Sequence, residues 1–380
     1  MAEKEIKCGS YGRCGACQML SCSYPEQLAR KKAFVEDAFR AKGIRIKVND
    51  VAGMADPYNY RNKVITYVSS DKGRIRLGMY EESSHKVVPV QDCALQNGTL
   101  NTILNSIREE LDRLKIRADG YGGVLKNILL RIGVKTGQVL VVFVTSEEMF
   151  HGRNDLVKRL TARHPEIRTI IQNINPRNTS VVLGDRERVL YGTGFICDRL
   201  FGNSFKISAK SFYQVNAEQM EVLYSTALGL AGIKDTDIVL DAYCGIGTIG
   251  ITAASKAGKV IGVEVNRDAV MDAISNSKYN HIDNTRFYCD DAGRFMSCFD
   301  GHVDVLVIDP PRSGCDAAFI KAIKELQPRK IVYISCNPVT QADDISRLTG
   351  IYKVSEAYPV DMFPHTSHIE NVVLLSISRL

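Results

Sequence analysis

The order of apolar and polar residues divides the chain into two stretches with different periods. From about residue 44 to about residue 204, runs such as KVITYV, RIRLGMY and KVVPV alternate in character, which is typical of antiparallel strands with one buried face. Within this stretch, LNTILNSIREELDRLKI has apolar residues at helical spacing. We therefore expect a strand-rich α+β domain over residues 44–204.

The same two periods predict further elements. NILLRIGV and QVLVVFVT predict a hairpin, residues 155–163 predict a helix, and TIIQNIN, SVVLG and RVLYGTGFI predict strands. Ahead of this domain, PEQLARKKAFVEDAFRAKGI predicts a helix that ends at Gly43. Its apolar residues at near-helical spacing are Leu28, Phe34, Val35 and Phe39.

After about residue 205, apolar strands alternate with helical patterns. The strand runs are DIVLDA, KVIGVE, TRFYC, VDVLVID and KIVYIS, and two C-terminal strands follow. This alternation predicts an α/β fold with a mostly parallel sheet covered by helices on both faces. We expect three parts, namely a cysteine-containing segment at 1–43, the α+β domain at 44–204 and the α/β domain at 205–380.

The composition is that of a globular protein, since 45% of the 380 residues are hydrophobic and 24% are charged. No apolar run could span a bilayer and no secretion signal is evident, so we expect a cytoplasmic protein. The net charge of +6 is mildly basic. Positive residues gather in one segment that holds a single acid, Asp71, and they are Arg61, Lys63, Lys72, Arg74 and Arg76. They favour either contacts with an anionic partner or a solvated strand surface.

The segment CGSYGRCGACQMLSC gathers four of the eleven cysteines near the N-terminus. Cys8, Cys14 and Cys17 form a C-x5-C-x2-C pattern, and the glycines between them permit a tightly wrapped backbone. Thiolates in such a group favour zinc or an iron–sulfur cluster, and the spacing does not choose between the two. A fourth ligand would come from Cys22 or, at a distance, from Cys93.

A glycine-rich turn and a series of acids follow the first strands of the α/β domain. Gly245, Gly247 and Gly250 open a helix, where small residues let the backbone approach a ligand. Their spacing matches G-x-G-x-x-G, so a nicotinamide or flavin enzyme is one candidate. Glu264 ends KVIGVE and suits a ribose, while Asp290 and Asp291 follow TRFYC and suit an adenine amine. Each acid could instead cap a helix.

The next two strands end in residues that favour chemistry. VDVLVID runs into Asp309, two prolines and Arg312, and the prolines fix a rigid lip that suits the presentation of a flat base to a methyl donor. KIVYIS runs into Cys336, followed by Asn337 and Pro338. A buried cysteine is often a small apolar filler, but one at the carboxyl end of such a strand is a candidate nucleophile.

Five motifs, DAYCGIGTIG, GVEVNRDAV, DPPRSG, SCNPVT and FPHTSHIENV, together resemble the RNA 5-methyluridine methyltransferases, an S-adenosylmethionine-dependent family. The resemblance runs from about residue 205 to the end, with SFYQVN as its lead-in. It implies a Rossmann-like methyltransferase domain preceded by an RNA-binding α+β domain. The cofactor residues that it implies are Gln214, Tyr243, Gly245, Gly247, Glu264, Asp291 and Asp309.

The same resemblance implies a covalent mechanism at uracil. Cys336 would add to C6 so that C5 becomes nucleophilic toward a methyl group, and Glu370 would then remove the C5 proton. Asp309 suits the uracil N3–H as an acceptor, and Arg312 suits O4 as a donor. The two histidines of HTSHIENV are expected to support Glu370. The target base would have to leave its stack to reach such a site.

The N-terminal cysteines resemble the [4Fe–4S] site of the 23S rRNA branch of this family. This likeness implies Cys8, Cys14, Cys17 and Cys93 as ligands and leaves Cys22 out. It favours 23S rRNA as the substrate, with transfer RNA as the alternative. The chain begins almost at the cluster, so we expect no N-terminal TRAM domain, and we expect a monomer.

Other activities stay open at this level. Cytosine C5 methylation would use a cysteine on the fourth-strand loop, where Cys315 is the nearest thiol. An adenine N6-methyltransferase would carry an aromatic residue where this chain has Arg312. An iron–sulfur nicotinamide oxidoreductase would explain the glycines and the cysteines, whereas a non-enzymatic RNA-binding protein would leave the five motifs unexplained.

Overall fold

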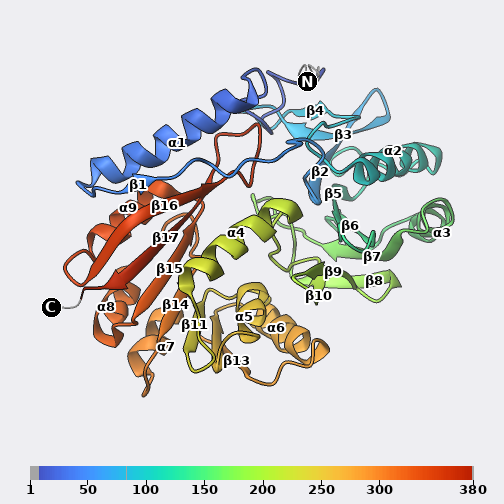
Figure 1. Ribbon diagram of the computed structural model, residues 1–380. Helices are drawn as coiled ribbons and strands as arrows, with labels where there is room; N and C mark the ends of the chain where they lie inside the picture. The colour runs from blue at the N-terminus through green and yellow to red at the C-terminus, as the bar shows by residue number, and fades with distance from the viewer. Residues whose placement is uncertain (1–7, 83, 379–380) are drawn as a thin grey trace. The chain divides into compact units, whose positions relative to one another are not determined.

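The computed structural model describes residues 8–82 and 84–378. Contacts within this part of the chain divide it into two compact units. The first unit takes the chain up to Leu20, together with Pro57–Arg199 and Lys206–Lys210, and the second takes Ser21–Asp56, Leu200–Phe205 and Ser211–Leu380. Each unit is built on its own sheet (Figure 1).

The first unit contains a seven-stranded sheet in the order β4-β3-β2-β5-β6-β7-β8. Its strands are β2 (Lys63–Asp71), β3 (Arg74–Tyr80), β4 (Val87–Pro89), β5 (Leu125–Ile132), β6 (Val139–Thr145), β7 (Ile167–Ile174) and β8 (Arg186–Gly192). Neighbouring strands are antiparallel except for the pair β6 and β7. The strand-rich α+β character that the sequence predicts for this region is confirmed.

Two helices, α2 (Gly98–Arg113) and α3 (Arg153–Arg163), share one hydrophobic core with this sheet. In α2 the apolar side chains at helical spacing are buried, while the cap residue Asn97 accepts a hydrogen bond from Thr99 N at 3.0 Å. The buried apolar residues of α2 are Leu100, Ile103, Ile107 and Leu111. Both helices therefore cover the face of the sheet that carries its apolar side chains.

The prediction of a strand at SVVLG is wrong, because residues 179–184 form a loop and β8 begins only at Arg186. The Asn175 side chain donates to the carbonyls of Val181 and Val182 at 2.7 and 2.9 Å. Gly184 N donates to the side chain of Asn173 at 2.7 Å. These side-chain hydrogen bonds satisfy the backbone without a neighbouring strand.

The second unit contains an eight-stranded sheet in the order β1-β16-β17-β15-β14-β11-β12-β13. Its strands are β1 (Lys47–Val48), β11 (Ile238–Ala242), β12 (Lys259–Glu264), β13 (Thr285–Cys289), β14 (Val305–Ile308), β15 (Lys330–Ser335), β16 (Tyr352–Val360) and β17 (Glu370–Ile377). Pairing is parallel except that β17 runs antiparallel to both of its neighbours, β15 and β16. The mostly parallel α/β sheet is confirmed.

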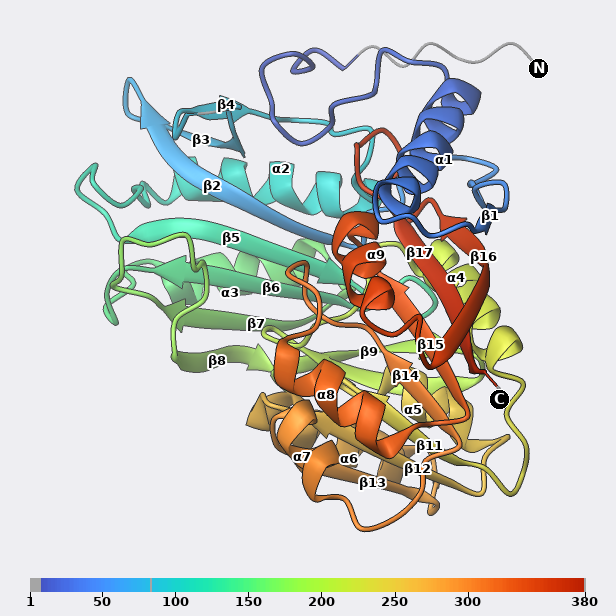
Figure 2. The same cartoon turned by 90° about the vertical axis from the view of Figure 1, so that its left-hand side faces the viewer.

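Helices cover both faces of this second sheet, as predicted (Figures 1 and 2). On one face lie α1 (Tyr24–Ala41), α7 (Ala292–Cys298), α8 (Ala317–Leu326) and α9 (Pro338–Ser346), which contribute to one core. On the other lie α4 (Ala217–Ala231), α5 (Thr248–Ala254) and α6 (Arg267–Tyr279). A small two-stranded sheet of β9 (Phe195–Leu200) and β10 (Asn203–Ser208) stands where the chain passes between the units.

The predicted helix before residue 44 is α1, and it ends before Gly43, whose φ is +70°. Val35 and Phe39 are fully buried in the core of the second unit, as their spacing predicts. Phe34, by contrast, is 43% exposed. Phe34 precedes Val35 by about 100° around the helix and so points away from the core. Over residues 8–82 and 84–378, no helix combines the length and the apolar character needed to cross a membrane.

Candidate active site

The glycine turn between β11 and α5 is held by a buried acid, Asp241. Its Oδ2 accepts a hydrogen bond from Gly250 N at 2.8 Å, and a Cβ at position 250 would lie only 2.9 Å from that oxygen. Gly245 and Gly247 have φ of +54° and +82°, the left-handed region that glycine adopts without strain. Burial raises the pKa of Asp241 to about 7. Sequence analysis did not single out Asp241, although an acid at the end of an apolar strand, just before the glycines, was a usable signal.

Glu264 at the end of β12 faces this turn. Its Oε2 accepts from Gly245 N at 3.2 Å, and its Oε1 accepts from Asn266 N at 2.8 Å. A carboxylate has about four acceptor positions, so Glu264 keeps capacity for ribose hydroxyls. Gln214 is buried just before α4, and Tyr243 adopts a positive φ of 65° in the turn itself. The structure thus joins Glu264 with the glycine turn, as the sequence predicts.

Asp291 stands after β13, the strand beside β12, and one of its oxygens has a structural use. Asp291 Oδ1 accepts from Arg294 N at 2.9 Å and caps α7, which is the alternative considered for each of these acids. The neighbouring Asp290 forms an ion pair with Arg294 at 2.5 Å. Asp291 therefore caps the helix and still carries a second oxygen at the carboxyl end of the sheet.

Cys336 and Glu370 are brought together by the antiparallel pairing of β15 with β17. Ser335 is paired with Asn371, so the residue after Ser335 and the residue before Asn371 stand opposite each other. Facing residues in an antiparallel pair have Cα atoms about 4.5–5.5 Å apart. The Cys336 side chain is partly exposed, whereas Glu370 is 3% exposed, and no described group hydrogen-bonds Glu370 Oε2.

Asp309 and Arg312 complete this group on the loop after β14, which pairs with β15. Loss of solvation raises the pKa of Asp309 to about 7. Burial and then the charge of Asp309 raise the pKa of Glu370 well above its usual range, while Arg312 acts in the opposite direction. The pKa of Cys336 is raised by burial and by Glu370, and a hydrogen bond from Arg312 lowers it. Four predicted site residues therefore influence one another directly.

The loops that carry Arg312 and Cys336 are fastened to each other. Asn337 Nδ2 and Thr340 Oγ1 both donate to the Arg312 carbonyl, at 3.0 and 3.2 Å. Asp344 in α9 accepts from Cys315 N at 2.7 Å and from the Tyr333 hydroxyl at 2.6 Å. Asp344 thus ties the DPPR loop to the helix that begins just after Cys336. Sequence analysis missed Asp344, because an acid inside a helix carries no signal of such a contact.

The two histidines of HTSHIENV differ in their surroundings. A ring nitrogen of His368 lies 3.1 Å from an Arg312 guanidinium nitrogen. His365 turns toward α1, where its N donates to Gln27 Oε1 at 2.9 Å and its Nδ1 lies 3.1 Å from Gln27 Nε2. Burial lowers the pKa of His365 to about 4, so it is neutral in ordinary buffers. His368 therefore contacts a residue of the group around Cys336, whereas the contacts given for His365 are with α1.

Comparison with known proteins decides the family. The tRNA (uracil-5-)-methyltransferase family matches residues 23–378. The chain belongs to this family. It is 38% identical to an uncharacterized RNA methyltransferase of Halalkalibacterium halodurans over 99% of this chain and 84% of that protein. It is also 38% identical to an uncharacterized RNA methyltransferase of Staphylococcus aureus, over 97% of this chain and 84% of the relative.

A solved structure agrees with the assignment of this chain to the uracil-5-methyltransferase family. The crystal structure of Pyrococcus abyssi tRNA (uracil-54, C5)-methyltransferase, in complex with S-adenosyl-L-homocysteine, has a TM-score of 0.78 and 27% identity. The likeness covers 96% of this chain and 86% of that chain. The S-adenosylmethionine-dependent α/β fold and RNA methyltransferase activity predicted from the sequence are therefore confirmed at the level of the family.

The cysteine segment of the methyltransferase lies in the first unit, apart from Cys22, which belongs to the second. Burial raises the pKa of Cys17 to about 12, and the charges of Cys14 and Cys93 add to this effect. Cys14 in turn is affected by Cys93 and Cys8. All of these thiols are unpaired and partly exposed. In the described ranges, no three His, Cys, Asp or Glu side chains stand in an arrangement that could hold a metal ion.

Proposed function

We propose that this enzyme is a 23S rRNA (uracil-5-)-methyltransferase that methylates C5 of a specific uridine through a covalent bond between Cys336 and C6. The observation that carries the proposal is the register of β15 and β17, in which a thiol and a buried carboxyl face each other beside Asp309 and Arg312. A nucleophile, a base and a polar pair for the uracil edge are the groups that this reaction needs.

S-adenosylmethionine would bind at the carboxyl ends of β11, β12 and β13 and supply the methyl group. Glu264 would accept hydrogen bonds from the ribose, and the second oxygen of Asp291 would accept from the adenine amine. The glycine turn fits a close approach of the ligand, because two of its glycines have positive φ. The complete set that we propose for the cofactor is Gln214, Tyr243, Gly245, Gly247, Glu264, Asp291 and Asp309.

The first step would be addition of the Cys336 thiolate to C6 of uracil. The S–C6 bond forms while the electron pair of the C5–C6 double bond moves toward C5 and O4. Arg312 supports this step twice, because its hydrogen bond lowers the pKa of Cys336 and its guanidinium is free of a carboxylate partner among the described residues. Asp309, when ionised, would accept the uracil N3–H and orient the ring.

The second step would be methylation of C5 followed by loss of its proton. The C5 proton passes to Glu370, the electron pair of that C–H bond restores the C5–C6 double bond, and the S–C6 bond breaks. Burial raises the pKa of Glu370, which makes its carboxylate a stronger base than an exposed glutamate. His368 would steady Arg312 rather than take the proton.

We propose further that Cys8, Cys14, Cys17 and Cys93 are the ligands of a [4Fe–4S] cluster, whose binding would draw these thiols closer together than they stand in the described ranges. The four thiols belong to one unit, and Cys14 and Cys17 are each affected by the charges of other members of the set. Thiolates are the ligands that such clusters use. Arg61 donates to Ala16 O at 3.0 Å and braces the loop between the ligands. Methyl transfer involves no redox change, so the cluster would hold this loop in shape.

Anaerobic purification tests the cluster. We expect brown protein with about four iron atoms per chain, and a Cys17→Ala variant that is colourless. A Cys22→Ala variant serves as the matched control and should keep its colour. Colourless parent protein that contains zinc would contradict the cluster, and loss of colour in the Cys22 variant alone would make Cys22 a ligand instead.

The choice of RNA rests on the cysteine set, which favours ribosomal RNA. Transfer RNA is the second candidate, because the P. abyssi structure with 27% identity is of a tRNA (uracil-54, C5)-methyltransferase. Nothing in the chemistry around Cys336 separates the two, since both reactions act on the same ring.

A trapped adduct tests the activity and the substrate together. Glu370→Gln protein, incubated with S-adenosylmethionine and total RNA from a strain that lacks the gene, should methylate C5 and then stall with the RNA attached to Cys336. The adduct is isolated on a denaturing gel, and the RNA is sequenced. We expect a single uridine of 23S rRNA. An adduct with transfer RNA would replace the proposed substrate, and the Cys336→Ala, Glu370→Gln double variant should form none. A Glu370→Gln enzyme without any adduct would contradict the proposed roles.

A further inference from the structure

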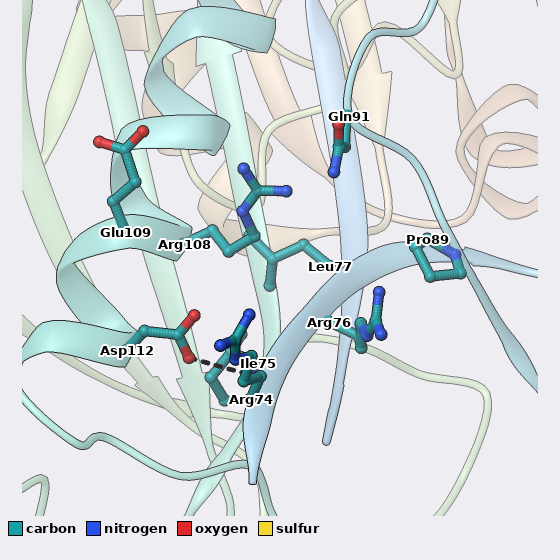
Figure 3. A pocket seen from close by; sticks show the side chains of 9 residues that line it. All are labelled: Arg74, Ile75, Arg76, Leu77, Pro89, Gln91, Arg108, Glu109 and Asp112. Atoms are coloured by element: carbon teal, nitrogen blue, oxygen red, sulfur yellow. Dashed lines mark hydrogen bonds between the residues drawn. The ribbon is translucent and has the colours of Figure 1, made fainter. Parts of the chain in front are cut away.

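A pocket in the first unit is lined by charged residues that the proposed chemistry does not use. It lies between helix α2 and the part of β3 that does not pair with β4, has a volume of about 350 Å³, and is closed on a third side by the chain after β4. Figure 3 shows Arg108 reaching from α2 toward β3, with Arg74 and Arg76 on the strand and Gln91 beyond β4. A cavity of this size holds a phosphate group with part of its ribose.

The two acids of the pocket are already engaged. Asp112 Oδ1 accepts from Ile75 N at 2.9 Å and closes the free edge of β3 (Figure 3). Glu109 forms an ion pair with Arg163 at 2.7 Å, and that hydrogen bond is the main reason why the pKa of Glu109 is lowered. Neither carboxylate therefore depends on the arginines of the pocket for its partner.

The arginines of the pocket are less engaged than the acids. Over residues 8–82 and 84–378, the guanidinium groups of Arg74 and Arg108 have no ion pair and no hydrogen bond. Arg76 pairs with Asp71 at 2.8 Å, but both side chains are about half exposed, and such pairs exchange readily for other partners. Three arginines and Gln91 thus line one cavity, and the guanidinium groups of Arg74 and Arg108 are available to an anion.

We propose that this pocket binds a backbone phosphate of the substrate RNA, with Arg108 and Arg74 as its principal contacts. The proposal rests on the proposed function, which makes RNA the substrate. Planar guanidinium groups donate two parallel hydrogen bonds to phosphate oxygens, which suits Arg better than Lys in such a site. The lining has no aromatic side chain on which a base could stack. The pocket therefore positions the RNA strand without reading its sequence.

Paired substitutions of equal charge test this proposal in the full-length protein. Arg74→Gln, Arg108→Gln removes the pocket arginines, and Arg186→Gln, Arg188→Gln is the control. The control pair lies two residues apart on β8, the opposite edge strand of the same sheet, and both of its arginines pair with Glu148. Binding of a fluorescein-labelled single-stranded 20-nucleotide RNA is measured by anisotropy at several KCl concentrations. Methylation kinetics are measured on in vitro transcribed 23S rRNA.

We expect the pocket variant to bind the RNA about five- to tenfold more weakly near 0.1 M salt, with a salt slope smaller in magnitude by about 0.7. Its KM for the RNA should rise by a similar factor, while kcat at saturating RNA stays within about twofold. The Arg74→Lys, Arg108→Lys variant should recover part of the affinity, because it keeps the positive charges but loses the planar guanidinium groups that donate two parallel hydrogen bonds. The control variant should keep the parental salt slope.

Two results would contradict the proposal that this pocket binds a backbone phosphate. One is an equal loss of affinity in both pairs, which would mean general attraction by net charge. The other is a parental KM and salt slope in the pocket variant. A parent enzyme that forms no 5-methyluridine on any RNA would instead contradict the proposed function, so the two failures are distinguishable.

Discussion

The two sheets of this protein use their strand ends differently. In the second unit, β11, β12, β13, β14 and β15 are parallel, so their carboxyl ends meet at one edge. Acids and a thiol gather there, and several have strongly shifted pKa values. In the first unit most neighbours are antiparallel, so successive strand ends fall at opposite edges. Its charged residues are spread over exposed positions of strands such as β3 and β8 instead.

This difference predicts two kinds of response to substitution. Groups at the shared edge of the parallel sheet act on one another, and Asp241 and Glu370 among them are buried, so removing one should have a large effect on the reaction. Groups on the exposed edges of the antiparallel sheet are solvated and largely independent, so their effects should be small and graded. Substitutions in both sheets test this difference.

The largest effect is expected at Cys336. Cys336→Ala should lower kcat by at least about 10⁴-fold, as loss of a covalent nucleophile typically does, measured by transfer of labelled methyl groups to 23S rRNA. Cys315→Ala is the matched control, because Cys315 is a buried thiol whose sulfur lies 3.8 Å from the Tyr333 hydroxyl. It should keep kcat within a few fold. An inactive Cys315 variant beside an active Cys336 variant would reassign the nucleophile and favour cytosine chemistry.

The next effect is on stability, at two neighbouring acids of α9. Asp344→Ala removes acceptors from Cys315 N and the Tyr333 hydroxyl and leaves Arg347 without its buried partner. We expect a loss of about 2–4 kcal/mol and a thermal midpoint lower by roughly 5–10 °C. Asp343 is about half exposed and pairs with Lys42 at the surface, so Asp343→Ala should change stability by less than about 0.5 kcal/mol.

Scanning calorimetry of the two variants measures this difference. Similar midpoints for both would mean that the buried contacts of Asp344 contribute no more than a surface pair. The expected difference between buried and solvated contacts would then be absent at the loop that Asp344 holds in place.

The sequence was sufficient to predict the parallel sheet and the residues at its strand ends. The spacing of apolar residues and the polar residues that follow each apolar run are both local patterns. Glu264 and the glycine turn meet as predicted for this reason. The antiparallel insertion of β17 between β15 and β16 was not predicted, although it is what brings Glu370 opposite Cys336. Strand order depends on contacts between distant segments, and no local period records it.

The contributions of Asp241 and Asp344 were missed for a related reason. Each is recognisable only from its partner, Gly250 N in one case and Cys315 N in the other. The failure at SVVLG has the opposite origin, because its composition is typical of a strand, while side chains of Asn173 and Asn175 take the hydrogen bonds. The spacing of apolar residues thus predicted most helices and strands. Hydrogen bonds between distant residues explain the loop at SVVLG and the contacts of Asp241 and Asp344, which that spacing does not reveal.

A smaller effect is expected from Arg312→Gln, through pH. Arg312 lowers the pKa of Cys336 and also that of Glu370, so its loss should raise both. The reaction requires both groups in the ionised form, and the rising limb of log kcat/KM against pH should therefore move to higher pH by about one unit. Arg329→Gln, at the opposite end of β15, removes an arginine that pairs with Asp237 and should leave the pH of the rising limb unchanged. A lower rate without a shift would give Arg312 a role in binding alone.

The smallest effect is expected at Asp71, the exposed last residue of β2 in the antiparallel sheet. Asp71→Asn releases Arg76 from an ion pair in which the two side chains are 54% and 43% exposed, so the free energy of unfolding should change by less than about 0.5 kcal/mol. The released guanidinium lines the arginine pocket, and the affinity for the labelled 20-nucleotide RNA should rise about twofold at low salt. Asp185→Asn is the control, because it frees Arg177 outside the pocket and adds the same charge. If both variants tighten RNA binding equally, only net charge matters on this sheet; if Asp71→Asn alone does so, even the solvated end of the β2–β3 pair has a preferred position for the RNA backbone.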